Sequence, residues 1–292
     1  MAKGLFRHWT SSVPLSVRVD RMSDYPKKLK RVVGDPRGRL GTFYEQLHLL
    51  QSRYGYAADL TGSEFRVFSQ NGEDGVIAEI VRRLGPECKR TFVEFGMGRG
   101  WAGNCVFLAD VLGWHGLFIE PALDDFTHLQ RKYRYTSRVR TICEFVSPDN
   151  IDAFITRAEL DGLGVLSIDV DGNDYYIWRN MTSRAALVVI EYNGSLPYDE
   201  FLVQPFSDKP WDGTAFFGCS LAALTKLGEE KGYQLVHTEM TGTNAFFVAD
   251  EHASCFTDIL DVPTRVANYE LLGHAHPRDR TSRTYLGELP PH

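Results

Sequence analysis

The feature that most constrains this chain is a short apolar run that ends in three glycines at alternate positions. The run spans residues 92–95, and Gly96, Gly98 and Gly100 follow it. Asn104 then opens a segment of helical character that continues to residue 112. A strand, a tight glycine turn and a helix form the unit with which α/β sheets hold nucleotide-like ligands, because glycine allows a sharp turn and a close approach of the ligand. A purely structural tight turn is the alternative interpretation.

Glu94 lies inside this expected strand, two residues before the first glycine. The resulting pattern, E-x-G-x-G-x-G, differs from the G-x-G-x-x-G of dinucleotide-binding proteins. A carboxylate at this place would repel a pyrophosphate, whereas it suits a cationic ligand. The turn therefore indicates a positively charged, nucleotide-like ligand.

Strands alternate with helices along the middle of the chain. We expect further strands at 116–120, 139–142, 163–169 and 187–190, a final antiparallel pair at 233–238 and 245–249, and helices at 42–53, 71–84, 124–133, 151–160 and 220–231. This order predicts an α/β, doubly wound, Rossmann-like parallel sheet with an N-terminal helical or irregular extension. Ligands of such sheets bind at the carboxyl ends of the strands.

Polar residues follow several of these strand ends. Glu120 ends the second strand, about 20 residues past the glycines, where a carboxylate accepts hydrogen bonds from ribose hydroxyls; a solvent-facing strand end is the alternative. Phe145 follows the third strand, where an adenine edge would lie. Asp169 and Asp171 follow the fourth strand, and Glu191 with Asn193 ends the fifth. Oxygen ligands from two neighbouring strand ends suit Mg²⁺, but Asp171 and Asn173 are equally placed to cap the next helix.

Four stretches of the chain resemble the class I S-adenosylmethionine-dependent methyltransferases, and most closely the FkbM-type group. They are residues 69–74, 93–100, 166–174, and 232–235 together with 244–248. The glycine motif specifies only the superfamily, whereas the run Ile168–Asp174 is similar to the more specific Ile-Asp-Val-Glu-Gly pattern of that group. The resemblance implies a seven-stranded sheet with the last strand antiparallel.

The resemblance also implies S-adenosylmethionine as cofactor and assigns residues to it by position. The cofactor turn would be shaped by Glu94, Gly96, Gly98, Gly100 and Asn104. Glu120 would hold the ribose, and Phe145 would lie by the adenine. Gln70 would cover the methionine end, and Asp169 would complete the site.

The implied activity is methyl transfer to a small-molecule acceptor, most simply O-methylation of a sugar or natural-product hydroxyl. A metal site of Asp169, Asp171, Glu191 and Asn193 would lower the pKa of that hydroxyl if it holds Mg²⁺. The resemblance equally allows Asp169 or Asp171 to act as a metal-free general base. His237 is the histidine selected as a further catalytic residue, although a core histidine is the commoner case. Other chemistry on the same cofactor, and a non-catalytic binding module on this fold, are the competing functions.

Charge and composition limit the partners. The net charge is −6, so a general nucleic-acid-binding surface is not expected. The chain has five cysteines without a CxxC pair and no long apolar run, which favours a cytoplasmic protein outside the membrane. We expect a basic N-terminal extension at 1–62, a methyltransferase domain at 63–255 and a C-terminal arm at 256–292, with the two arms as candidates for contacts in a homo-oligomer.

Overall fold

The centre of the molecule is a seven-stranded sheet. The computed structural model describes residues 36–54, 59–259, 262–268 and 283–289. The strands are β1 (Thr91–Phe95), β2 (His115–Ile119), β3 (Val139–Ile142), β4 (Leu163–Ile168), β5 (Ala185–Glu191), β6 (Tyr233–Thr238) and β7 (Asn244–Ala249). They follow the order β3-β2-β1-β4-β5-β7-β6, and β7 runs in the direction opposite to the other strands. This confirms the predicted doubly wound sheet with its antiparallel last strand.

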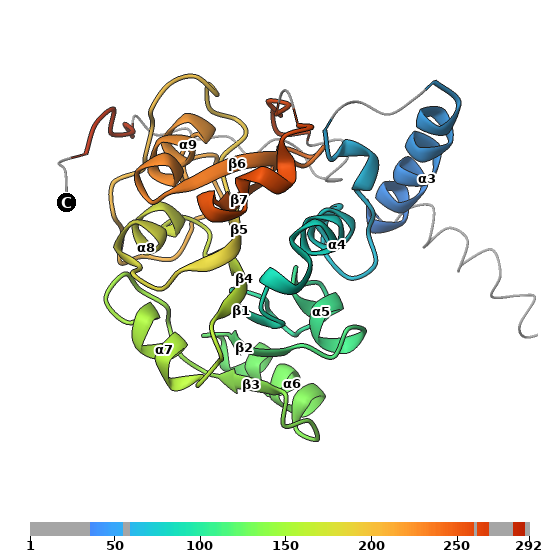
Figure 1. The fold of residues 1–292 in the computed structure, drawn as a ribbon. Helices are drawn as coiled ribbons and strands as arrows, with labels where there is room; N and C mark the ends of the chain where they lie inside the picture. Colours follow the sequence, from blue (N-terminus) through green and yellow to red (C-terminus); the bar gives the residue numbers. More distant parts are fainter. Residues whose placement is uncertain (1–35, 55–58, 260–261, 269–282, 290–292) are drawn as a thin grey trace, which may run out of the picture.

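Helices cover both faces of the sheet (Figure 1). On one face lie α4 (Glu73–Leu84), α5 (Val106–Asp110) and α6 (Leu123–Tyr133), and on the other lie α7 (Ile151–Arg157), α8 (Asp174–Asn180) and α9 (Leu221–Glu230). Short 3-10 turns span Thr61–Ser63, Gly85–Glu87 and Asp250–Phe256. The helix predicted at 151–160 ends earlier because Glu159 takes a positive φ of 51°, which a right-handed helix does not allow.

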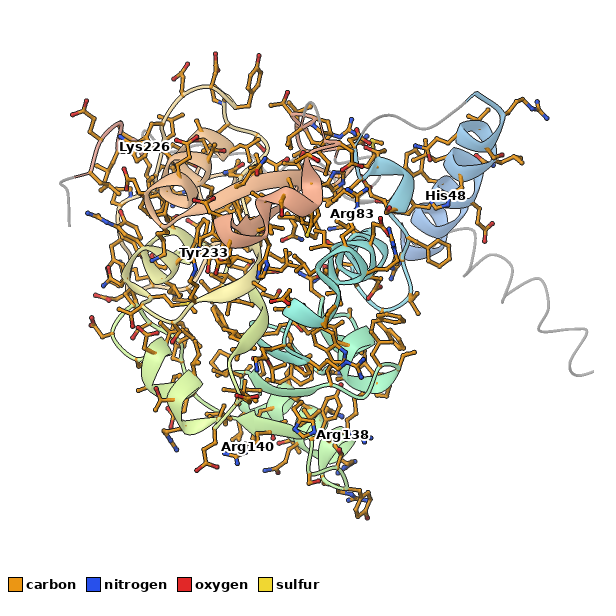
Figure 2. All side chains as sticks on the ribbon, in the orientation of Figure 1. His48, Arg83, Arg138, Arg140, Lys226 and Tyr233 are labelled. Atoms are coloured by element: carbon orange, nitrogen blue, oxygen red, sulfur yellow. The ribbon has the colours of Figure 1, made fainter. Side chains whose placement is uncertain are left out.

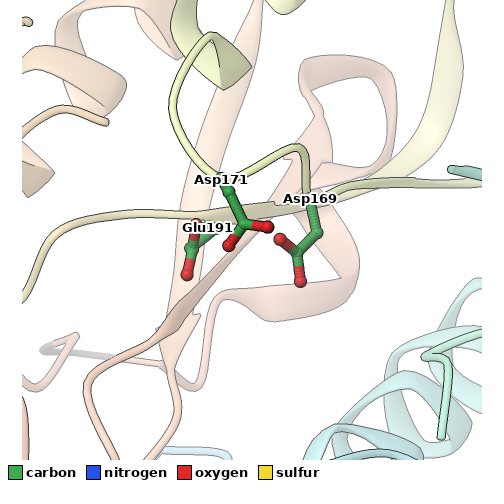
Figure 3. A group of neighbouring side chains, drawn as sticks. All are labelled: Asp169, Asp171 and Glu191. Atoms are coloured by element: carbon green, nitrogen blue, oxygen red, sulfur yellow. The ribbon is translucent and has the colours of Figure 1, made fainter. Parts of the chain in front are cut away.

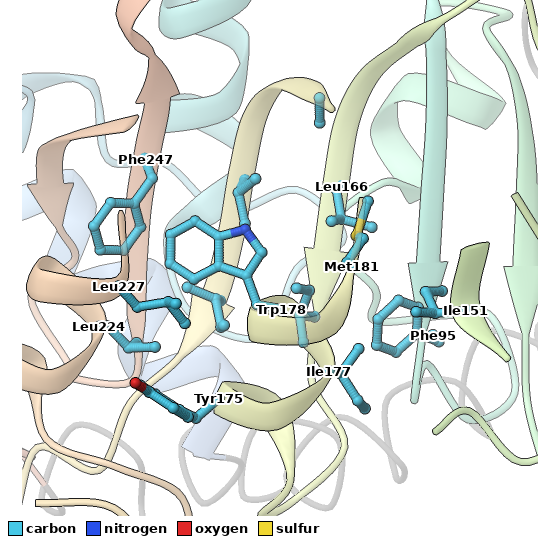
Figure 4. Packing of buried hydrophobic residues seen from close by; sticks show 14 of the residues in the cluster. Phe95, Ile151, Leu166, Tyr175, Ile177, Trp178, Met181, Leu224, Leu227 and Phe247 are labelled. Atoms are coloured by element: carbon cyan, nitrogen blue, oxygen red, sulfur yellow. The ribbon is translucent and has the colours of Figure 1, made fainter. Parts of the chain in front are cut away.

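Alternation along each strand divides the apolar core into two layers. Phe92 and Phe118 pack toward α4 to α6, whereas Phe95 and Leu166 pack toward α7 to α9. In the second layer the indole of Trp178 lies 4.9 Å from the Phe247 ring, measured between ring centroids (Figure 4). Burial of this apolar surface on both faces is the main driving force for the fold and fixes the register of the strands.

The N-terminal helix α3 (Pro36–Tyr54) lies outside the layer of α4 (Figure 1). The Tyr44 hydroxyl donates a 2.9 Å hydrogen bond to the buried carboxylate of Glu64. His48, labelled on α3 in Figure 2, has a ring nitrogen 2.7 Å from the carbonyl oxygen of Glu64. Two residues of α3 therefore bond to the same buried residue of the domain, Glu64. Residues 1–35 of the predicted basic extension lie outside the described residues.

The described parts of the C-terminal arm pack against the domain of the same chain. The amide of Ala267 donates to the carbonyl of Gly194, and Leu286 forms a two-way backbone bridge with Val203. The boundaries predicted after residues 62 and 255, and the role of the arms in an oligomer, stay predictions. Among the residues that the structure describes, no helix is both long enough and apolar enough to cross a membrane.

Candidate functional site

The register of the sheet brings the predicted residues into one row at its carboxyl edge. Phe95 of β1 pairs with Ile119 of β2 and with Ile168 of β4, and Ile168 pairs with Ile190 of β5. The next residue of each strand is therefore level with the others. This row reads Glu120, Gly96, Asp169 and Glu191, and Glu191 pairs further with Asn244 of β7.

The glycine turn at the centre of this row allows two backbones to touch. Gly96 has a φ of +79°, and a Cβ added there would lie 1.7 Å from the carbonyl oxygen of Asp169. Gly98 has a φ of +58°, but a Cβ at this position would meet nothing within 4 Å. At Gly100, with a φ of +78°, a Cβ would lie 2.8 Å from the side chain of Leu129. Gly96 is thus required by close packing against β4, whereas Gly98 faces open space.

The carboxylate of Glu94 joins β1 to the start of α5. It accepts hydrogen bonds from the backbone N–H groups of Asn104 (2.7 Å) and Cys105 (2.9 Å). Burial raises the pKa of Glu94 to about 7. The Asn104 side chain in turn donates to the hydroxyl of Ser167 on β4 over 3.1 Å. These two predicted cofactor residues therefore hold the glycine turn between β1 and β4.

Glu120 has a similar structural role on the other side of the turn. It is buried and accepts hydrogen bonds from the N–H groups of Gly98 (2.7 Å) and Ala122 (2.8 Å), one on each carboxylate oxygen. Each oxygen can accept a second hydrogen bond, so these contacts are compatible with ribose binding. Three apolar side chains are exposed beyond the ends of β1, β2 and β3: Trp101 (66%), Leu123 (69%) and Phe145 (63%).

A cavity of about 270 Å³, here called the first cavity, lies over the row. Its lining includes the predicted residues Gln70, Glu94, Gly96, Asn104, Asp169, Asp171 and Glu191. Gly98, Gly100, Glu120 and Phe145 are absent from this lining. Sequence reasoning missed Asn244 and Ala267 as lining residues. Asn244 lies within a stretch that carries the resemblance, and its pairing with Glu191 is decided by the sheet register.

Three carboxylates meet in the first cavity. Single oxygens of Asp169, Asp171 and Glu191 all lie within 4.8 Å of one another, and Figure 3 shows the three side chains converging. We call this group the acidic trio. Burial, and then the charges of Asp174 and Asp171, raise the pKa of Asp169. The pKa of Glu191 is raised by burial and then by the charge of Asp169. The pKa of Asp171 is raised by burial. Mutual repulsion of this kind is relieved by a cation or by a shared proton.

The turn that presents Asp171 is fixed by Asp174. Asp171 takes a φ of +54°, a strained conformation for a residue with a side chain. The carboxylate of Asp174, in the first turn of α8, accepts hydrogen bonds from the N–H groups of Val170 and Gly172, each over 2.9 Å. Asn173 occupies the N-cap position of α8 without a side-chain capping bond. The helix-capping interpretation is wrong for Asn173, because its side chain makes no capping bond to α8 and instead donates to the carbonyl of Ser207.

Two buried acceptors in the first cavity lack a partner. Oε2 of Glu191 and Oδ1 of Asn244 make no hydrogen bond within the part of the chain that the structure describes. Asn244 is nine-tenths buried, and its amide nitrogen donates over 2.8 Å to the fully buried carboxylate of Glu73. Buried polar atoms are normally satisfied, so these oxygens call for a donor or a cation. These two oxygens suit an ammonium or sulfonium group, and they also suit a divalent metal ion.

Asn193 requires a correction. Its amide nitrogen donates to the carbonyls of Ala215 and Phe217, each over 3.0 Å, and its Oδ1 accepts from the N–H of Ser195. The side chain thus holds the loop at 215–217, and it is not available as a metal ligand beside the acidic trio. The prediction failed because residue spacing places Asn193 near the edge without showing where its amide points.

His237 requires a second correction. The ring is completely buried in β6, with Nε2 3.0 Å from the Glu64 carboxylate, and it does not line the first cavity. Burial lowers the pKa of His237 to about 3. A histidine that is neutral and enclosed in the core cannot exchange protons with a ligand in the cavity, so His237 is a core residue.

No protein-family model and no curated protein matches the chain. Among solved structures, the N-terminal domain of EvdMO1 with SAH bound is 11% identical, over 70% of this chain and 94% of that chain, with a TM-score of 0.40. The CurJ carbon methyltransferase is 12% identical, over 82% and 72%, with a TM-score of 0.41. An S-adenosylmethionine-dependent methyltransferase from Clostridium acetobutylicum is 9% identical, over 71% and 99%, with a TM-score of 0.38. The function proposed below rests on the residues of this chain.

Proposed function

We propose that this chain is an S-adenosylmethionine-dependent methyltransferase that acts on a small molecule, most simply on a sugar or natural-product hydroxyl. The observation that carries the proposal is the row Glu120, Gly96, Asp169 and Glu191 at the carboxyl edge, with an anionic cavity directly above it. The finer FkbM-type assignment rests on the run Ile168–Asp174 of the sequence.

The two halves of the cofactor would occupy different parts of this edge. The adenosine half fits the open side of the glycine turn, where Gly98 faces free space, Glu120 offers acceptor positions for a ribose, and Leu123 and Phe145 present exposed apolar surface. The methionine half fits the first cavity, beside Gln70 and the unpartnered oxygen of Asn244. An acceptor-rich, buried surface of this kind favours a cationic amino acid moiety.

S-adenosylmethionine supplies an electrophilic methyl group when bound, so the chain has to align an acceptor oxygen with it and exclude water. Transfer would form a bond from that oxygen to the methyl carbon and break the carbon–sulfur bond, and a group of this chain would have to receive the hydroxyl proton. Asp169 and Asp171 lie where such a proton can be received. Their pKa values are raised by burial, which brings a carboxylate closer to the operating range of a general base.

A metal-assisted version uses the same residues. The acidic trio would hold Mg²⁺ with one oxygen from each carboxylate, and water and the acceptor would complete the coordination. Bound Mg²⁺ would supply positive charge that lowers the pKa of the acceptor hydroxyl. Methyl transfer that is lost with EDTA and restored by Mg²⁺ supports this version, whereas EDTA-insensitive transfer favours Asp169 or Asp171 as the base.

Titration calorimetry with S-adenosylmethionine and S-adenosylhomocysteine tests the proposal. We expect both to bind, and we expect Asn244→Ala to weaken both, because this variant removes an acceptor from the first cavity. Asn180→Ala is the matched control, since Asn180 is an exposed residue at the end of α8. Absence of binding of either compound to the wild-type protein contradicts the proposal. Once an acceptor is found, a product heavier by one CH₂ identifies methylation.

A further inference from the structure

A second cavity adjoins the first one and shares two of its walls. It measures about 390 Å³, and both cavities are lined by Asp171 and Trp211. Asp171 belongs to the acidic trio, so the second cavity opens at the place where the first one carries its reactive carboxylates. Most of the remaining wall comes from residues 204–207, 209, 210 and 212 and from Phe216, and Arg283 and Thr284 of the C-terminal arm complete it.

The walls of the second cavity are held in place by hydrogen bonds. The Asn173 side chain donates to the carbonyl of Ser207 over 2.7 Å, and the Tyr176 hydroxyl donates to the carbonyl of Gln204 over 2.8 Å. At the other end, the Tyr285 hydroxyl bonds the carbonyl of Ala215 over 3.1 Å. The cavity is therefore shaped before any ligand arrives, which lowers the entropic cost of binding.

Aromatic side chains line the second cavity and leave much of their surface uncovered. Phe206 is 48% exposed and Trp211 is 42% exposed. The Trp211 indole N–H is already used by the carbonyl of Thr214, over 2.8 Å, so its ring faces are what it offers to a ligand. Faces of this kind stack on aromatic rings and on the apolar faces of sugar rings.

The charges of the second cavity are unequally satisfied. Arg283 forms an ion pair with Asp212 over 2.8 Å and lies over the ring of Phe216, 4.5 Å from its centroid. Lys209 lines only the second cavity, and its ammonium forms no ion pair with the residues that the structure describes. The second cavity thus presents the Asp171 carboxylate, which it shares with the first cavity, and the Lys209 ammonium, which lines the second cavity alone and has no ion-pair partner among the described residues.

We propose that the second cavity is the acceptor site, and that its ligand is a hydroxylated ring that carries an anionic substituent. The ring lies against Trp211 and Phe206, a hydroxyl reaches Asp171 and the acidic trio, and the anionic group pairs with Lys209. This inference rests on the proposed function, because Asp171 is the point at which acceptor and methyl donor meet. A sugar acid and an aromatic hydroxy acid share this chemistry.

Binding of matched acidic and neutral probes to the protein saturated with S-adenosylhomocysteine tests the inference. The probes are protocatechuate and its methyl ester for the aromatic arm, and D-glucuronate and methyl D-glucoside for the sugar arm. We expect the acidic member of one pair to bind roughly tenfold more tightly than its neutral partner. Lys209→Glu should abolish that preference, and Trp211→Ala should weaken both members of the pair. Lys89→Glu reverses a charge at an exposed site outside both cavities, and it should change neither the preference for the acidic probe nor the affinity for either probe.

Several results overturn the acceptor assignment. They are the failure of both acidic probes to bind the wild-type protein, equal affinity for acidic and neutral members, and unchanged affinities in Lys209→Glu or Trp211→Ala. Calorimetry with S-adenosylhomocysteine on the same samples separates the two levels of the argument. If S-adenosylhomocysteine binds and the probes do not, only the acceptor assignment fails; if S-adenosylhomocysteine does not bind, the proposed function fails with it.

Discussion

Replacement of Gly96 by alanine offers the sharpest test of how the site is built. The added Cβ would lie 1.7 Å from the carbonyl oxygen of Asp169, whereas an ordinary Cβ contact measures 3.4–4 Å. The end of β1 and the end of β4 would therefore have to separate by roughly 1.7 Å or more. The contact atom is backbone, so no side-chain rotation relieves it.

Two costs add up in Gly96→Ala. Holding an L-residue at a φ of +79° costs about 1–2 kcal/mol. Forcing an extra methyl group into a packed site costs about 1–3 kcal/mol more. The total, about 2–5 kcal/mol, is a large part of the stability of an ordinary domain. For a domain of this size it corresponds to a fall in Tm of roughly 5–15 °C.

Gly98→Ala is the matched control, because Gly98 also has a positive φ but a Cβ there would meet nothing within 4 Å. It should carry the conformational cost alone, about 1–2 kcal/mol. Thermal unfolding of both ligand-free variants, followed by circular dichroism, measures the difference. An equal loss of stability in the two variants would refute the reasoning, since the contact between Gly96 and Asp169 would then contribute nothing.

Three further predictions concern buried charges. Tyr44→Phe should lower the free energy of unfolding by about 1–2 kcal/mol, because it removes a hydrogen bond to the buried Glu64. The control Tyr198→Phe, at an exposed site, should leave this free energy unchanged. Equal effects of the two variants in denaturant titrations would contradict the prediction. Burial raises the pKa of Glu64 and Glu94 to about 7 and that of Glu239 to about 8, so the folded protein binds more protons than the unfolded chain between about 4.5 and these values. The free energy of unfolding should therefore fall as the pH rises from about 6.5 to about 8, and a constant value over that range would show that these groups titrate normally. Mg²⁺ should raise Tm more at about pH 8 than at about pH 5.5, because the acidic trio must lose protons to bind a cation; a pH-independent effect would argue against that site.

The sequence by itself determined the sheet and the place of its ligand edge. Short apolar runs between helical segments predicted the strands, and the glycines after residue 95 marked a turn at a carboxyl end. The position of a residue relative to its own strand is a local property, and parallel pairing then aligns the strand ends. For this reason Glu120, Gly96, Asp169 and Glu191 could be assigned to one edge before their contacts were known.

Only the tertiary structure decided what each polar side chain does there. Glu94 and Glu120 have the positions expected of ligand-binding residues, yet their oxygens hold backbone amides of the turn. His237 is enclosed beside Glu64, which is 173 residues away in the chain. The second cavity combines the loop at 204–212 with Arg283. Hydrogen-bond partners and cavity walls depend on which distant segments meet in space, and residue spacing carries no record of that.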